Sequence, residues 1–294
     1  MSEYRLIALD VDGTILNPVG QLSPRVIAAV QAAQARGVTV ALATARRWTG
    51  AAPIARALGL RGPLILYDGA LRRLSPGGAI ELALPLAKDI ALEVARRMVA
   101  GGVRAVAQYS PLAGERMVAS VELPMGGWME PYLDTFAHQV RYRPVAALLG
   151  RRAPLRLVSF APLERLRPLA EQMADLKAEW QILESGSYGQ AELTLFAPDV
   201  SKGAALTQLA TDLRIPLAET LALGDGVNDI SMLRAAGLGV AMGNAAAPAR
   251  LAADVVTASN AEDGAARAIE RYVLGEPGEP GEPGEAEELT EEPA

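Results

Sequence analysis

The first predicted strand of this chain ends in charged residues. Residues 6–9 (LIAL) form an apolar run that is typical of a buried strand, and Asp10 and Asp12 follow it in the motif Asp-Val-Asp-Gly-Thr. Charge at the end of a buried strand is costly, and two neighbouring carboxylates repel each other unless a cation or a shared proton relieves them. The motif therefore predicts a cation site, with a simple Asp-Gly turn as the structural alternative.

The same pattern of apolar strand and polar end recurs along the chain. Residues 38–43, 63–67 and 221–223 are further apolar runs, and helical segments separate them, such as the one that begins at Ser23-Pro24. Near-continuous apolar strands that alternate with helices are typical of a parallel sheet covered on both faces. We therefore expect an α/β fold with a Rossmann-like, doubly wound parallel-sheet core.

Between about residues 84 and 187 the sequence has a different character. The strand candidates there (103–109, 117–121 and 155–160) alternate more and carry more charge, and helices are expected near 88–100 and 163–178. This predicts an inserted α+β cap domain whose sheet has one open face. The expected domains are a discontinuous core, 1–84 plus 188–274, and a cap, 85–187.

Residue usage narrows the possible chemistry. The chain has 294 residues, enough for two domains, no cysteine, and a single histidine, His138. Disulfides, thiolate catalysis and cysteine or multi-histidine metal sites are excluded, so carboxylates, hydroxyls, lysine and arginine must carry any reaction. The start of the chain does not resemble a signal peptide, and we find no apolar run of 18 residues. These features predict a cytoplasmic protein that does not span a membrane.

The net charge of −6 comes from the last twenty residues. Residues 275–294 contain eight glutamates and no basic residue, and without them 26 acidic residues remain against 28 basic ones. A nearly neutral body gives no reason to expect nucleic-acid binding. The tail offers no apolar face to bury, so we expect it to be disordered and acidic.

Polar residues end each of the predicted core strands. In an open parallel sheet these ends share one edge, where ligands bind, and Lys202 at the start of a later helix can reach the same edge. Carboxylates and a hydroxyl suit Mg²⁺ and a phosphoryl group, and an aspartate beside phosphorus can attack it. The strand-end residues are Asp10 and Asp12, Thr44, Asp68, and residues 224–229 (GDGVND).

Four of these motifs, in this order, resemble those of the haloacid dehalogenase superfamily. They are Asp10-Val11-Asp12-Gly13-Thr14, Thr44, Lys202-Gly203 and Gly224-Asp225-Gly226-Val227-Asn228-Asp229. The insertion between Thr44 and Lys202 is similar in place and length to the IIB-class α/β cap of the Cof-type subfamily. The resemblance extends over about residues 4–273, and the order of the motifs makes it specific.

The resemblance implies a Mg²⁺-dependent phosphatase that acts on small phosphorylated metabolites, sugar phosphates above all. Asp10 would be the nucleophile, and the carboxyl of Asp12 would protonate the leaving oxygen and then activate water. Asp12 would also offer its backbone carbonyl to the metal. The positions implied to bind phosphoryl oxygens are Thr44, Lys202 and Asn228, and those implied to hold Mg²⁺ are Asp10, Asp12, Asp225 and Asp229.

Each of these residues also has a structural interpretation when taken alone. Thr44 would be a strand-end hydroxyl, Lys202 a solvated lysine, Asp225 a turn residue and Asp229 an acid at a helix N-terminus. Two positions depart from the family pattern: Ala45 stands where glycine is usual, and Asp68 replaces a frequent asparagine. We expect Asp68 to add negative charge near the site.

Other residues carry weaker signals. Asn244 matches the family and is expected either to face the site or to serve a turn. In the cap, no spacing marks Glu115, Arg116 or His138 as substrate contacts. Trp128, beside Gly126-Gly127, is expected to pack in the core, with an aromatic of a cap loop as the alternative.

Two alternatives to the phosphatase stay open at this point. A phosphomutase would use the same nucleophile and return the phosphoryl group to sugar. A non-catalytic ligand-binding protein would keep the fold without the chemistry. The sequence does not determine the oligomeric state or the physiological ester.

Overall fold

The computed structural model describes residues 4–74, 79–110, 115–184 and 188–275. The chain divides into two compact units: the first comprises residues 1–40 and 210–294, and the second comprises residues 41–209. The core and cap bounds expected from the sequence describe a different division and stay a prediction. The acidic tail that we expect to be disordered lies outside the described residues, apart from Gly275.

The first unit contains a parallel sheet with the strand order β14-β13-β12-β1. Its strands are short and almost wholly apolar, which is the pattern of strands buried on both faces. All four residues of β1 are fully buried. The strands are β1 (Leu6–Leu9), β12 (Thr220–Gly224), β13 (Leu238–Ala241) and β14 (Val255–Val256).

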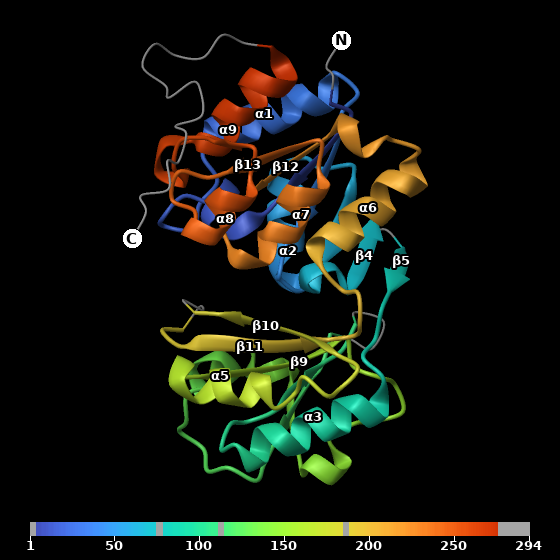
Figure 1. Ribbon diagram of the computed structural model, residues 1–294, viewed down its shortest axis with the longest axis vertical. Helices are drawn as coiled ribbons and strands as arrows, with labels where there is room; N and C mark the ends of the chain where they lie inside the picture. The colour runs from blue at the N-terminus through green and yellow to red at the C-terminus, as the bar shows by residue number, and fades with distance from the viewer. Residues whose placement is uncertain (1–3, 75–78, 111–114, 185–187, 276–294) are drawn as a thin grey trace, which may run out of the picture. The chain divides into compact units, whose positions relative to one another are not determined.

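Helices pack around this sheet. The helix α1 (Pro24–Ala35) begins as predicted, because the hydroxyl of Ser23 accepts the N–H of Val26 at 3.1 Å. It lies beside α9 (Gly264–Ile269), while α7 (Ile230–Ala235) packs on β12 and β13 and α8 (Ala247–Ala252) packs on β13 (Figure 1). The short turns of this unit are η1 (Val11–Ile15), η6 (Leu217–Glu219), η7 (Val227–Asp229), η8 (Asn260–Glu262) and η9 (Glu270–Leu274).

The second unit contains two groups of strands, and the first group comes earlier in the chain. There β2 (Thr39–Ala43), in which the division of units falls, pairs in parallel with β3 (Pro63–Leu66), and α2 (Trp48–Ala57) connects them. The next two strands, β4 (Leu71–Leu74) and β5 (Ile80–Ala83), are antiparallel. These two strands were not predicted from the sequence; they are short and contain Arg72, Arg73 and Glu81. The turn η2 (Tyr67–Gly69) joins β3 to β4.

The second group is a six-stranded sheet with the order β10-β11-β9-β6-β7-β8. All neighbouring strands are antiparallel except β7 and β8. Together with its helices, this sheet forms the α+β arrangement that was predicted for the inserted segment. The strands are β6 (Val106–Gln108), β7 (Met117–Ser120), β8 (Val140–Arg143), β9 (Arg156–Ala161), β10 (Glu179–Leu183) and β11 (Ala191–Phe196).

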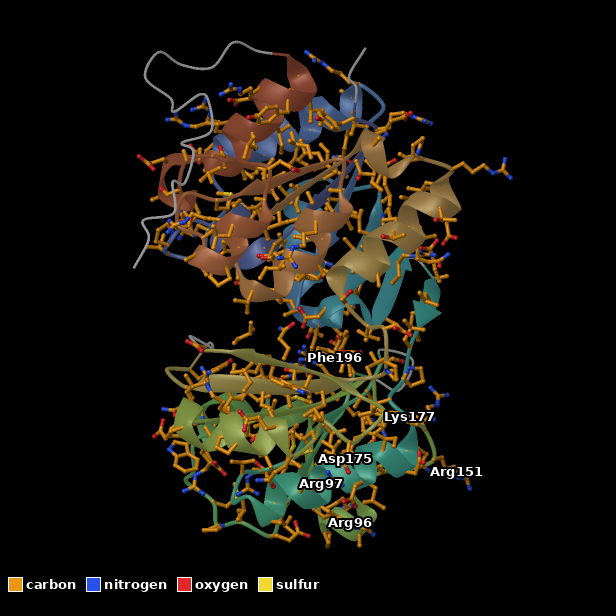
Figure 2. All side chains as sticks on the ribbon, viewed as in Figure 1. Arg96, Arg97, Arg151, Asp175, Lys177 and Phe196 are labelled. Atoms are coloured by element: carbon orange, nitrogen blue, oxygen red, sulfur yellow. The ribbon has the colours of Figure 1, made fainter. Side chains whose placement is uncertain are left out.

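The two faces of this sheet differ. The helices α3 (Lys88–Ala100) and α5 (Leu163–Glu171) cover one face, over a core that includes Leu157, Leu193 and Leu195 (Figure 1). Figure 2 shows Phe196 on the opposite face from Arg97, which donates from Nη2 to Asp175 at 3.0 Å.

The remaining elements are α4 (Glu130–Thr135), η4 (Ala137–Gln139), η5 (Val145–Ala147) and α6 (Lys202–Leu213).

One predicted helix is shorter than expected. The helix was expected over residues 163–178, but α5 ends at Glu171. Beyond it the backbone forms tight turns, in which Met173 N–H donates to Ala170 O and Leu176 N–H to Met173 O. Among the helices in the described ranges, none has both the length and the apolar character needed to cross a membrane.

Candidate active site

Two aspartates follow neighbouring parallel strands of the first unit. Asp10 comes directly after β1 and Asp225 directly after β12, and the register pairs Leu9 with Leu223. The N–H of Asp10 donates to the carbonyl of Leu223 at 3.0 Å. Because the two strands run in the same direction, their carboxyl ends meet at one edge of the sheet, as expected from the sequence.

Three carboxylates gather at this edge. Asp10, Asp225 and Asp229 each offer an oxygen, and these oxygens all lie within 4.8 Å of one another. Asp10 is 4% exposed and Asp229 1% exposed, so water screens their mutual repulsion poorly. A hard divalent cation relieves such crowding, and an all-oxygen donor set suits Mg²⁺.

The loop after β1 is held against Asp225. Gly13 has φ = +79°, a left-handed conformation that favours glycine, and the hydroxyl of Thr14 donates to Asp225 Oδ1 at 3.0 Å. The side-chain amide of Asn244 donates to the carbonyl of Gly13 at 2.9 Å, so Asn244 fixes the loop. The side chain of Asp12 is exposed and is not one of the three clustered carboxylates.

The loop after β12 is organised around Asp229. Its Oδ2 accepts the N–H of Asp225 at 3.0 Å and the N–H of Gly226 at 2.8 Å. Asp229 thereby shapes the turn that carries Asp225, in addition to bringing its own carboxylate to the cluster. Asn228 lies half-buried in the same turn.

Two predicted phosphate ligands, Thr44 and Lys202, belong to the second unit. Thr44 follows β2 and is 1% exposed; its hydroxyl accepts the N–H of Arg46 at 3.1 Å. Lys202 opens α6 and is fully buried, so it is not the solvated lysine of the structural interpretation. That these two residues share one site with Asp10 stays a prediction.

Asp68 does not add an uncompensated negative charge. Its Oδ2 lies 3.2 Å from Nη1 of Arg156, and both side chains are buried. Arg156 also donates from Nε to Gln108 Oε1 at 2.8 Å. The negative charge that Asp68 was expected to add is therefore balanced by a cation from β9.

Glu192 on β11 is a second acid in this neighbourhood. Burial raises the pKa of its carboxyl, and the nearby charge of Asp68 raises it further, while Arg156 and a hydrogen bond from Thr194 act in the opposite direction. The folded protein therefore holds the Glu192 proton more tightly than the unfolded chain does.

This shift predicts a pH dependence of stability. Because the folded-state pKa is raised, stability from the protonated carboxyl is present below the unfolded-state pKa and is lost as pH rises through the folded-state pKa. We expect Glu192→Gln to flatten this fall, so that the variant gains stability over the wild type as pH increases from 4 to 8. Thermal unfolding across this range measures it, with the exposed Glu184→Gln as control. Parallel curves for wild type and Glu192→Gln would contradict the assignment.

The cap residues without a sequence signal meet in one cleft of the second unit. It has a volume of about 470 Å³ and is lined by Thr49, Glu115, Arg116, His138, Gln139, Val140 and Arg141. The carboxylate of Glu115 accepts the N–H of Thr49 at 3.0 Å and the hydroxyl of Tyr67 at 3.1 Å. Burial raises the pKa of Tyr67 well above its usual value, so its hydroxyl stays protonated and donates. Sequence spacing gave no sign of this gathering.

Trp128 departs from the expected core position. Its side chain is 38% exposed, and the guanidinium carbon of Arg165 lies 5.2 Å from its ring centre. The flanking Gly126 and Gly127 place it in a loop, where the apolar ring is covered by a cation instead of by the core.

Comparisons with known proteins identify the family of this chain. The family model of haloacid dehalogenase-like hydrolases matches residues 7–269. The chain is 31% identical over 286 residues to "Phosphatase YwpJ" of Bacillus subtilis, covering 92% of this chain and 100% of that protein.

Solved structures share the fold. A haloacid dehalogenase-like hydrolase from B. subtilis aligns with a TM-score of 0.76 and 26% identity over 92% of this chain and 100% of the other. BT4131, named a subclass IIB sugar phosphatase, aligns with a TM-score of 0.74 and 22% identity over 91% of this chain and 98% of that one. The fold is thus the predicted α/β core with an inserted α+β cap. The chain belongs to the haloacid dehalogenase-like hydrolases, in their Cof-type branch.

Proposed function

We propose that this protein is a Mg²⁺-dependent phosphatase that hydrolyses small phosphate monoesters through a phosphoaspartate at Asp10. The observation that carries the proposal is the group of three carboxylates, Asp10, Asp225 and Asp229, within 4.8 Å of one another at the carboxyl ends of β1 and β12. A relative that is named a phosphatase, and that this chain matches over the relative's whole length, supports the same reaction.

The residues of the cluster fit Mg²⁺. Asp10, Asp225 and the backbone carbonyl of Asp12 would hold the ion, with Asp229 in support, and all of these donors are oxygen atoms. When bound, Mg²⁺ offsets the negative charge of the carboxylates and of the phosphoryl oxygens.

The reaction then proceeds in two displacements. A carboxylate oxygen of Asp10 attacks phosphorus, the ester P–O bond breaks, and the Asp12 carboxyl gives its proton to the leaving alkoxide. Asp12 next takes a proton from water, which attacks the phosphoaspartate and releases inorganic phosphate. Asp12 is exposed at its side chain and can exchange protons with solvent.

Phosphate binding is assigned to residues with N–H or O–H groups. Thr44 and Lys202 would hold the phosphoryl oxygens, and Asn228 would assist. Lys202 begins α6 and is fully buried, and an ammonium group binds phosphoryl oxygens strongly where water is excluded. Sugar phosphates are the proposed substrate class, because the four motifs resemble those of the haloacid dehalogenase superfamily. The proposed location of the protein is cytoplasmic.

A metal-dependence experiment tests the proposal. We expect the purified full-length chain to release phosphate from p-nitrophenyl phosphate, and from some members of a panel of sugar phosphates, nucleotides and cofactor phosphates. Excess EDTA should remove essentially all of this activity, and added Mg²⁺ should restore it. Phosphate release that is unaffected by EDTA would rule out the metal assignment.

The same panel separates the alternatives. Isomerised sugar phosphate without free phosphate would identify a phosphomutase. No turnover of any ester with Mg²⁺ present would indicate a non-catalytic binding protein on the same fold.

A further inference from the structure

Arg47 is a buried cation with an unused donor. Its side chain is 6% exposed and lies in the loop between β2 and α2, three residues after Thr44. Its Nη1 donates to Gln139 Oε1 at 2.6 Å, and its guanidinium carbon lies 4.1 Å from the ring centre of Phe136. Its Nη2 is buried and has no hydrogen-bond partner in the described part of the chain.

Other buried arginines of the second unit are paired with acids. Arg156 lies 3.2 Å from Asp68, and Arg104 lies 3.2 Å from Glu130. Within the described ranges no ion pair is recorded for Arg47, whose partners are a neutral amide and an aromatic face. A buried guanidinium N–H group without an acceptor is unfavourable, and an anion would remove that cost.

The surroundings of Arg47 indicate where such an anion would lie. Its partner Gln139 lines the cleft of about 470 Å³, which is the size of a small-metabolite site. Arg116 and Arg141 line the same cleft, and Glu115, the acid among its described lining residues, already accepts two hydrogen bonds. The cleft therefore favours a negatively charged ligand.

We propose that Arg47, held by Gln139 and Phe136, binds an anionic group on the leaving part of the substrate. Preferred substrates are then phosphate esters that carry a second anion, either a carboxylate or another phosphate. Arg47 contacts Phe136 and Gln139, which belong to the inserted region and not to the strand-end motifs, and for this reason we assign it to the leaving group. This inference rests on the proposed phosphatase function.

The wild-type enzyme tests the substrate class directly. Glycerol 3-phosphate is compared with 3-phosphoglycerate, and glucose 6-phosphate with glucose 1,6-bisphosphate, so that the two pairs separate a carboxylate from a phosphate. We expect kcat/KM to be at least about tenfold higher for the doubly anionic member of one pair, because charge-assisted hydrogen bonds are strong in buried sites. Equal or lower values in both pairs would overturn the inference.

Substitution of Arg47 tests the residue. In Arg47→Met we expect the advantage of the second anion to fall about tenfold or more, while p-nitrophenyl phosphate, which lacks that anion, changes less than about threefold. Arg47→Lys should recover part of the advantage, and the exposed Arg143→Met should retain all of it. Equal losses on all esters in Arg47→Met would overturn the inference, and if that variant does not fold, the wild-type pairs decide.

Turnover of p-nitrophenyl phosphate by the wild type, measured first, separates the two proposals. Activity on p-nitrophenyl phosphate without a preference for esters that carry a second anion refutes only the role of Arg47. Its absence, together with the absence of activity on every other ester, refutes the phosphatase itself.

Discussion

Asp10→Asn is expected to abolish turnover while leaving the fold intact. The amide keeps the size of the side chain but is a very poor nucleophile toward phosphorus, and it also removes one charge from the three-carboxylate cluster. Loss of a nucleophile in a working catalytic group costs several orders of magnitude, so we expect kcat to fall by about 10⁴-fold or more. Phosphate release with Mg²⁺ present measures it.

Two further measurements make this result specific. Asp263→Asn is a matched control, because asparagine tolerates the left-handed backbone at this position (φ = +58°) and Asp263 is not in the carboxylate cluster. It should retain wild-type activity. The melting temperature of Asp10→Asn should be equal to or above that of the wild type, since relief of repulsion between buried acids is stabilising. Substantial turnover by Asp10→Asn would refute a covalent route through this residue.

Much of the first unit could be predicted from local sequence. Apolar runs followed by polar residues marked the ends of β1 and β12, and parallel pairing then required Asp10 and Asp225 to meet. The hydroxyl of Ser23 capped α1 as expected, because capping depends on residues only three apart. Local sequence patterns were sufficient for functional residues that directly follow, in the sequence, the strand that positions them.

Contacts between distant segments could not be predicted in this way. Asp68 was expected to add negative charge near the site, but its charge is balanced by Arg156, which lies 88 residues away on β9. The acceptor of Arg47 is Gln139, 92 residues away. Hydrophobic periodicity places residues on faces of elements, but it does not determine which faces meet, so the charge balance of the second unit became visible only in three dimensions.

Backbone geometry at Gly13 was also invisible to the sequence patterns. A glycine after Asp12 is compatible with an ordinary turn, but a Cβ atom at this position would lie 2.1 Å from Asp225 Oδ2. That approach is far inside van der Waals contact, and the obstructing atom belongs to a carboxylate of the cluster. Gly13 is therefore required by the closeness of two loops as well as by its own conformation.

Gly13→Ala is accordingly expected to disrupt the site through one added methyl group. The residue has φ = +79°, so alanine there costs about 1–2 kcal/mol in backbone strain, and displacement of Asp225 adds to this. Since a shift of about 1 Å in a catalytic group reduces rates about 100-fold, we expect kcat/KM to fall at least that far. We also expect a higher Mg²⁺ concentration for half-maximal activity, because Asp225 is a proposed ligand.

Gly20→Ala isolates the contribution of backbone strain. Gly20 has φ = +75°, nearly the same as Gly13, but a Cβ atom there would meet nothing within 4 Å among the described residues. Both variants should lose stability by about 1 kcal/mol or more from strain, whereas only Gly13→Ala should lose activity and Mg²⁺ affinity. Thermal unfolding and Mg²⁺ titrations of phosphate release compare the pair. If Gly13→Ala kept the activity and metal response of Gly20→Ala, the close contact between Gly13 and Asp225 would have no part in holding the metal ligands.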